Sequence, residues 1–480
     1  MTPDLLSILA TAAPEGGTEG AGIDAFINVI YLISAIGFVL SLKWLSHPST
    51  ARRGVFAGEL GMLLAIVGTL IKTEIVEYRW ILLAMVVGGV VGAPIALLIK
   101  MTAVPQRTAF SHALGALAAG LVGTAEFYLH PGGLSRVVMT AIGFEVILGY
   151  LTFTGSLMAF GKLQGILPGK PILYKGRNII NLSIFAGAAL CAIYLVLNPG
   201  ATYLFPWLIG LSLVFGVLLI IPIGGADMPT VIALLNGYAG LAAAAMGFAI
   251  NNKLLIIAGA LDGTSGLILS IIMCKAMNRS FTNVLFGGFG AVAPAKGEVE
   301  ERTVRNIHPE EAAQILESAS SVIVVPGYGM AVSQAQHKVR ELYDALTREG
   351  VDVRFAIHPV AGRMPGHMNV LLAEADIPYD KLIEMDEINS DFARTDVALI
   401  VGANDVVNPA ARTDETSPIY GMPILNVDHA LTVMVVKRGM SAGFAGVENE
   451  LFFMDKTMML FGDAKSYIGD IVKELSGVPA

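Results

Sequence analysis

Long windows of apolar residues dominate the chain up to about residue 276. A membrane-spanning helix needs about 20 such residues, because each one adds ~1.5 Å across a hydrocarbon core roughly 30 Å thick. Nine windows meet this requirement and predict nine spanning helices. They run approximately over Ile23–Leu42, Val55–Ile71, Trp80–Ile99, Ala109–Leu129, Val137–Phe160, Ile179–Leu197, Tyr203–Ile221, Thr230–Ile250 and Leu254–Lys275.

After residue 305 the pattern changes to short β-branched runs that alternate with helical stretches. The runs SVIVV, VDVRFAIHP, VALIVG, PILNV and TVMVVK are expected to be strands. Helices are expected from about Ala331 to Arg348 and near His367 to Ala375. Strands and helices in alternation predict a parallel sheet with crossover helices. We therefore expect a tail (residues 1–22), a transmembrane domain (23–279), a linker (280–305) and an α/β domain (306–480).

The composition supports this division. Only 15% of the 480 residues are charged and 54% are hydrophobic, whereas ordinary soluble domains have about 25% charged residues. The net charge of −8 argues against nucleic acid as a partner. The two cysteines, Cys191 and Cys274, lie inside or at the end of apolar runs, so neither a disulfide framework nor a metal site is expected.

Basic residues gather in alternate loops between the predicted helices. The loops after windows one, three, five, seven and nine hold Lys43, Arg52, Arg53, Lys100, Arg107, Lys162, Lys170, Lys175, Arg177, Lys275 and Arg279. The opposite side holds Lys72, Arg79, Arg136 and Lys253. By the positive-inside rule the first set is cytoplasmic. The sequence therefore predicts a multi-pass membrane protein with its C-terminal domain in the cytoplasm.

A glycine-rich turn follows the first predicted strand of the α/β domain. In VIVVPGYGMAV, Gly327, Gly329 and Val332 have G-x-G-x-x-V spacing between a strand and a helix. The first glycine permits the tight turn, the second lets the backbone approach a pyrophosphate, and the helix N-terminus supplies N–H groups. This context favours a Rossmann-like dinucleotide-binding domain, and the alternative is a simple glycine turn.

The end of the second strand indicates which dinucleotide is bound. An NAD-binding unit would have an acidic residue there for the ribose 2′-hydroxyl. The sequence FAIHPVAGRMPGH has no acid but does contain Arg363, and Lys437 and Arg438 adjoin in VVKRG. Because cations suit a 2′-phosphate, NADP(H) is favoured over NAD(H). The alternative is a solvated basic turn.

Ionisable and polar residues are rare in the apolar half, and at membrane depth such groups are functional candidates. His112 can act in a proton relay, since histidine titrates near neutral pH, or can be a packing histidine. Asn236 can bridge to His112 through water or form a hydrogen bond between helices. Glu126 and Asp262 are expected at helix ends facing water, and Asp227 is expected to be a helix N-cap. The sequence leaves the role of Glu145 open.

Several long motifs resemble the β subunit of proton-translocating nicotinamide nucleotide transhydrogenases. In the α/β part they are PGYGMAVSQAQ, GRMPGHMNVLLAEADIPYD, GANDVVNPAAR and VKRGMSAGFAGVENELFF. In the membrane part they are LTFTGSLMAFGKLQG, IGGADMPTVIALLNGYAG and IMCKAMNRSF. The resemblance extends over almost the whole chain.

The resemblance implies that this chain binds NADP(H) and that a separate α subunit binds NAD(H). It also implies that two αβ units assemble into a homodimer. Hydride transfer from NADH to NADP⁺, of the Re/Si-specific type, would then be coupled to inward proton movement. The segment KRGMSAGFAGVENE matches a lid, in which Phe444 replaces a frequent tyrosine, and Asp405 matches an acid that senses the nicotinamide and the proton. The implied cofactor-binding residues are Gly327, Tyr328, Gly329, Ala331, Val332, Arg363, Gly402, Asn404, Asp405, Lys437 and Arg438.

In the membrane, the resemblance matches His112 to the histidine of a proton channel and Asn236 to a polar channel residue. Asp227 matches an acid at the cytoplasmic mouth, and Gly266 matches a packing glycine. Asp262 is unusual for the family. Two other functions remain open: a secondary transporter with an NADP-sensing regulatory domain, and a soluble reductase that is only anchored by its helices.

Overall fold

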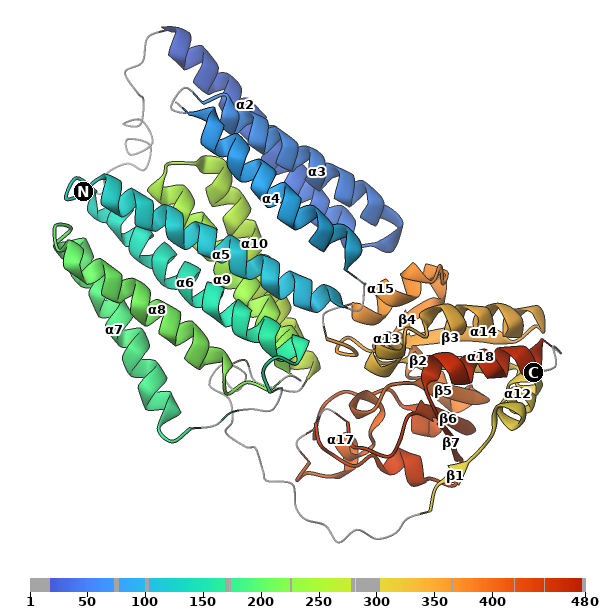
Figure 1. Cartoon of the computed structure of the whole chain (residues 1–480). Helices are drawn as coiled ribbons and strands as arrows, with labels where there is room; N and C mark the ends of the chain where they lie inside the picture. Colours follow the sequence, from blue (N-terminus) through green and yellow to red (C-terminus); the bar gives the residue numbers. More distant parts are fainter. Residues whose placement is uncertain are drawn as a thin grey trace, which may run out of the picture.

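The computed structural model describes residues 18–72, 77–99, 103–168, 172, 174–224, 227–277, 281, 303–363, 366–417, 419–443 and 445–476. Figure 1 shows a group of long helices with an α/β domain at one end of it. Most of the expected tail and linker lies outside the described residues, as does Phe444.

The described residues include nine helices long and apolar enough to cross a membrane, which confirms the nine predicted windows. The 3₁₀ turn η2 (Thr202–Leu204) precedes α8, so the seventh helix proper begins later than expected. The helices are α2 (Thr18–Leu45), α3 (Pro48–Leu70), α4 (Tyr78–Leu98), α5 (Val104–Leu129), α6 (Arg136–Gln164), α7 (Arg177–Leu197), α8 (Phe205–Ile220), α9 (Met228–Ala249) and α10 (Lys253–Ala276).

Glycines bring α9 and α10 into backbone contact. A β-carbon added at Gly266 would lie 2.5 Å from the Gly237 nitrogen, and one at Gly240 would overlap the backbone of Gly263. Small residues allow such close approach in lipid, where apolar side chains gain little by leaving the surrounding acyl chains. The opposite case is α4, which has no buried residue in the described structure.

The α/β domain is built on a seven-stranded parallel sheet of order β1-β7-β6-β5-β2-β3-β4. The six strands β2 to β7 reproduce the Rossmann order, and β1 is added at one edge beside β7. From β2 the chain adds β3 and β4 on one side, and then returns to add β5, β6 and β7 on the other side. Such domains bind ligands where the strand order reverses in this way, here between β2 and β5. The strands are β1 (Arg305–Asn306), β2 (Ser321–Pro326), β3 (Asp352–Ile357), β4 (Leu382–Glu384), β5 (Val397–Val401), β6 (Thr432–Lys437) and β7 (Thr457–Phe461).

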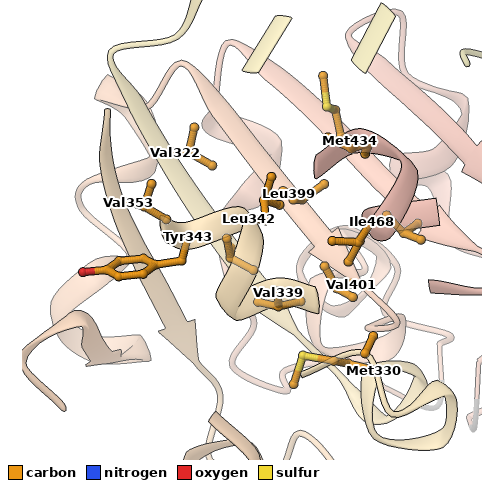
Figure 2. Close-up of a cluster of buried hydrophobic side chains, with 14 of the residues drawn as sticks. Val322, Met330, Val339, Leu342, Tyr343, Val353, Leu399, Val401, Met434 and Ile468 are labelled. Carbon is orange, nitrogen blue, oxygen red and sulfur yellow. The ribbon is translucent and has the colours of Figure 1, made fainter. Parts of the chain in front are cut away.

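Side chains of each strand alternate between two cores, as the period of two requires. Val322 packs in the core on one face of the sheet, which helices of the α/β domain cover, and Ile323 packs in the core on the opposite face. Figure 2 shows the first core, in which Val322 and Leu399 of the sheet meet Leu342 and Ile468 of the covering helices. That layer contains α12 (Pro309–Ser318), α14 (Gln336–Arg348), α15 (His367–Glu374) and α18 (Ala464–Leu475). The opposite layer is shorter, with α16 (Met385–Ile388) and several 3₁₀ turns.

Two expectations for the α/β domain are wrong. The helix expected from Ala331 to Arg348 is two helices, α13 (Tyr328–Ser333) and α14, because Gln334 has a left-handed backbone with φ of 52°. The run PILNV is irregular rather than a strand, and its Leu425 nitrogen donates to the Val406 carbonyl of a loop. The short strands β1 and β4 were not predicted, because two or three residues form no readable alternation.

Candidate functional site

A cavity of about 430 Å³ lies at the point where the sheet order reverses. Its walls on the sheet side are the loops after β2, β3 and β5, together with residues 442, 443 and 445. Its other walls are Asp227 and Pro229 at the start of α9, and Met277 at the end of α10. The cavity therefore joins the carboxyl edge of the sheet to the ends of two membrane helices.

The turn after β2 and the turn after β5 are locked together backbone to backbone. Gly327 and Gly329 donate to the Val401 and Gly402 carbonyls, both at 2.9 Å. A β-carbon at Gly329 would lie 2.7 Å from the Gly402 Cα, and Gly402 itself has φ of +70°. These glycines are therefore required by the close contact between the two turns.

The structure does not bring every residue of the glycine motif to the cavity. Gly327, Tyr328, Gly329, Gly402, Asn404 and Asp405 line it, as does Arg363. Ala331 is buried in the core, and Val332 is 47% exposed and lines neither this cavity nor the adjoining hollow.

A smaller hollow of about 180 Å³ adjoins the cavity and contains the two predicted cations. Lys437 and Arg438 line it, with Gly329, Gly402 and Asn404 as walls common to both spaces. The Lys437 ammonium donates to the Ser441 carbonyl and lies 5.3 Å from the centre of the Phe452 ring. Burial lowers the pKa of Lys437, and the nearby Asp405 charge partly opposes this. An anion in the hollow would compensate the cost of burying this cation.

Arg363 is separated from the Lys437 and Arg438 pair. It lines the larger cavity, with its guanidinium carbon 4.2 Å from the centre of the Tyr328 ring. Its Nη1 donates to the Leu163 carbonyl of α6 at 3.0 Å. The sequence grouped the three cations, but the structure divides them between two spaces.

Hydrogen bonds tie the loop after β6 to the loop after β5. The Asp405 Oδ2 accepts from the Ala445 nitrogen at 2.9 Å, and Gly443 packs against the Asp405 carboxylate. The Asn449 Nδ2 donates to the Asn404 carbonyl at 3.1 Å. The segment expected to be a lid therefore contacts Asn404 and Asp405 directly.

Two buried histidines shape the loop after β3, and the sequence did not single them out. The Arg363 nitrogen donates to His367 Nδ1 at 3.0 Å, and the Val360 nitrogen donates to His358 Nδ1 at 3.2 Å. Burial lowers the pKa of each histidine to about 4, so both are neutral at pH 7. Their neutral rings hold the loop that presents Arg363 to the cavity.

A polar pair crosses the interface of α9 and α10. The Asn236 Nδ2 donates to Asp262 Oδ1 at 3.0 Å. The expectation that Asp262 lies at a helix end is wrong, since it is inside α10 and close enough to act electrostatically on His112 of α5. His112 is half-buried, and its Nδ1 has no hydrogen-bond partner among the described residues. An apolar window shows where a helix lies in the sequence but not which helices pack against it. The hydrogen bond between Asn236 and Asp262 was therefore not predicted.

The remaining membrane candidates lie elsewhere. Glu126 is near the end of α5, as expected, and pairs with His130 at 3.1 Å. Glu145 is fully buried on α6 against Gly123. Asp227 occupies the N-cap position of α9, but its side chain makes no capping hydrogen bond, so that part of the expectation is wrong. Asp227 lines the cavity instead.

Lys162, expected in a loop, is a buried residue in the last turn of α6. Its ammonium donates to the carbonyls of Ile220, Ile221 and Ile223, at 3.1, 2.6 and 2.7 Å. A lysine that satisfies three carbonyls at the end of α8 fixes the packing of α8 on α6.

The model of the family described as NAD(P) transhydrogenase beta subunit matches residues 27–474. The chain belongs to this family. It is 50% identical over 457 residues to a protein of Rhodospirillum rubrum named NAD(P) transhydrogenase subunit beta, covering 93% of this chain and 98% of the relative. A relative from a named strain of the same species gives the same values.

Membership of the β-subunit family has three consequences. The chain is part of an oxidoreductase, it uses a nicotinamide nucleotide, and the designation β implies an α-subunit partner. Nine apolar helices fit a multi-pass membrane protein. The described residues contain no cluster of three His, Cys, Asp or Glu side chains suited to a metal ion.

Proposed function

We propose that this chain binds NADP(H) and couples hydride transfer from NADH to NADP⁺ to proton movement across the membrane. The observation that carries the proposal is the cavity whose walls come both from the glycine turns of the sheet and from the ends of α9 and α10. A nucleotide at that position would contact both domains at once.

The preference for NADP(H) follows from the charges around the two spaces. β3 ends at Ile357 and is followed by His358, with no acid to hold a ribose 2′-hydroxyl. Lys437 and Arg438 line the smaller hollow and suit a 2′-phosphate. The glycine turns leave room for the rest of the nucleotide beside Asn404 and Asp405. The nicotinamide ring supplies the carbon that accepts or gives the hydride, so the protein's task is to bind and orient it.

Proton movement is assigned to the polar residues at membrane depth. His112, Asn236 and Asp262 lie on three helices, and Asp227 lies where α9 meets the cavity. An ionisable group in the hydrocarbon region is costly and is retained for a function. Coupling requires that protonation favour one conformation of the nucleotide site, because only a difference in affinity between two states transmits free energy.

The membrane potential sets how strongly inward proton movement can drive hydride transfer. One charge that crosses 100 mV releases about 2.3 kcal/mol, so a potential near ~150 mV shifts the hydride equilibrium on the order of 10²-fold.

The location and assembly of the protein are also part of the proposal. We place the α/β domain in the cytoplasm of a bacterium, with the chain in a homodimer of αβ units in the inner membrane. The α subunit would bind NAD(H), and the Re/Si-specific type of transfer is part of the proposal.

Reconstitution in vesicles tests the proposal. With an α subunit present, NADH should reduce NADP⁺ while protons move inward, and an imposed pH gradient should change the rate. Solute flux without the α subunit would instead indicate a transporter, and hydride transfer that ignores the gradient would indicate an anchored reductase. Either result would contradict coupling.

A further inference from the structure

One backbone carbonyl joins the α/β domain to two membrane helices. Leu163 is buried near the end of α6, and its carbonyl accepts hydrogen bonds from two side chains. Gln106 at the start of α5 donates its Nε2 at 3.4 Å, and Arg363 donates its Nη1 at 3.0 Å. Three segments far apart in sequence therefore meet at one oxygen atom.

On its other side Arg363 contacts the glycine turn. Its guanidinium stacks on Tyr328, the residue between Gly327 and Gly329. A planar guanidinium can lie flat against a ring and donate within its own plane at the same time, whereas a lysine ammonium has no planar face. The Arg363 Nε is buried, and among the described residues it has no hydrogen-bond partner. The side chain thus spans from the turn to the membrane helix.

The charge of Arg363 also suits the end of α6. The last carbonyls of a helix carry partial negative charge, which a cation stabilises. Lys162, one residue before Leu163, directs its ammonium to the end of α8 instead. Arg363 thus supplies positive charge to the Leu163 carbonyl, and this contact crosses between the domains.

We propose that Arg363 is a positioning residue that transmits the state of the glycine turn to α5 through the Leu163 carbonyl. The inference rests on the proposed function. Lys437 and Arg438 line a hollow that Arg363 does not line, so binding of a 2′-phosphate does not require Arg363. Gln106 precedes His112 on α5 by about 9 Å along the helix axis. A shift of Tyr328 on nucleotide binding would therefore reach the helix that carries His112.

The experiment uses the full chain with an α subunit in vesicles and compares Arg363→Ala, Arg363→Gln and Arg363→Lys with the unsubstituted protein. Arg394→Ala is the matched control, because the Arg394 side chain is 82% exposed, pairs with Asp391 and lines neither of the two spaces. The variants should still prefer NADP(H) over NAD(H), because Lys437 and Arg438, which line the hollow proposed for the 2′-phosphate, are unchanged. Protons moved per hydride should fall about 10-fold in all three variants, since none of them has the planar guanidinium that joins the Tyr328 ring to the Leu163 carbonyl.

Two results would overturn the inference. A loss of about 30-fold or more in NADP(H) affinity, with loss of discrimination against NAD(H), would make Arg363 a phosphate ligand. An unchanged ratio of protons to hydride in the three variants would remove the role of the Leu163 contact. If the unsubstituted protein moves no protons, the proposed function itself fails, so the two failures are distinguishable. Arg363→Lys keeps the positive charge, so it still tests the inference if Arg363→Ala or Arg363→Gln does not fold.

Discussion

Close contacts between glycines occur in two regions, the interface of α9 and α10 and the paired turns after β2 and β5. In both, a β-carbon would overlap neighbouring backbone. The membrane interface depends on this close packing, because burial from water contributes little between helices in lipid. The paired turns lie above two hydrophobic cores that hold the sheet independently. The same kind of contact therefore stabilises the fold in one region and shapes the wall of a cavity in the other.

The largest effect is expected for Gly266→Ala. The added β-carbon would lie 2.5 Å from the Gly237 nitrogen, so α9 and α10 must move apart and the Asn236 to Asp262 hydrogen bond must stretch. Coupled activity in vesicles should fall about 100-fold or more. Gly210→Ala is the control, because nothing lies within 4 Å of its β-carbon position. Equal activity of the two variants would contradict an interface that depends on close packing.

A smaller loss is expected for Gly402→Ala, which affects the binding site but leaves both cores intact. We expect NADP(H) affinity to fall about 30-fold, because both the positive φ and the contact with Gly329 are disturbed. Gly350→Ala isolates the backbone strain, since Gly350 has φ of +87° and open space around it. Titration of NADP(H) and thermal unfolding of the full chain would separate the two contributions. The comparison fails if Gly402→Ala lowers stability more than Gly266→Ala does.

Substitution of Asp262 sharpens the comparison within the membrane. Asp262→Asn keeps a hydrogen-bonding partner for Asn236 but cannot bind a proton, whereas Asp262→Val removes both. We expect proton movement to fall about 10-fold in each variant, with NADP(H) affinity in detergent unchanged. If Asp262→Asn pumps normally, Asp262 is a packing partner for Asn236 and not a proton-binding group.

The smallest effect, a few-fold change, is expected from pH at the smaller hollow. In the proposed function the charged form of Lys437 binds the 2′-phosphate, and burial lowers the pKa of this lysine. The charged fraction therefore declines as the pH rises through the lowered pKa, and NADP(H) affinity should weaken in alkaline solution. Lys437→Arg should flatten this dependence, because arginine stays protonated. Affinity measured across alkaline pH for both proteins checks the sign, and a rise in affinity with pH would contradict it.

The sequence predicted the elements well where one physical requirement dominates. The nine spanning helices follow from hydrocarbon thickness, and the glycine turn follows from backbone crowding between strand and helix. Neighbours in space were not accessible in the same way. The contact of Arg363 with Leu163 joins positions 200 residues apart, and the depth of Asp262 depends on which face of α10 meets α9. Short strands such as β4 were missed because their pairing, rather than their composition, defines them.

Helix α4 has the highest mean hydropathy of the nine spans, 2.5, and no buried residue in the described structure. Its internal hydrogen bonds and its hydrocarbon surroundings therefore suffice to form it, without a partner from the rest of the chain. Such a segment can enter the bilayer during synthesis as soon as it leaves the ribosome. The glycine-lined helices α9 and α10 reach their final structure only after both have been inserted.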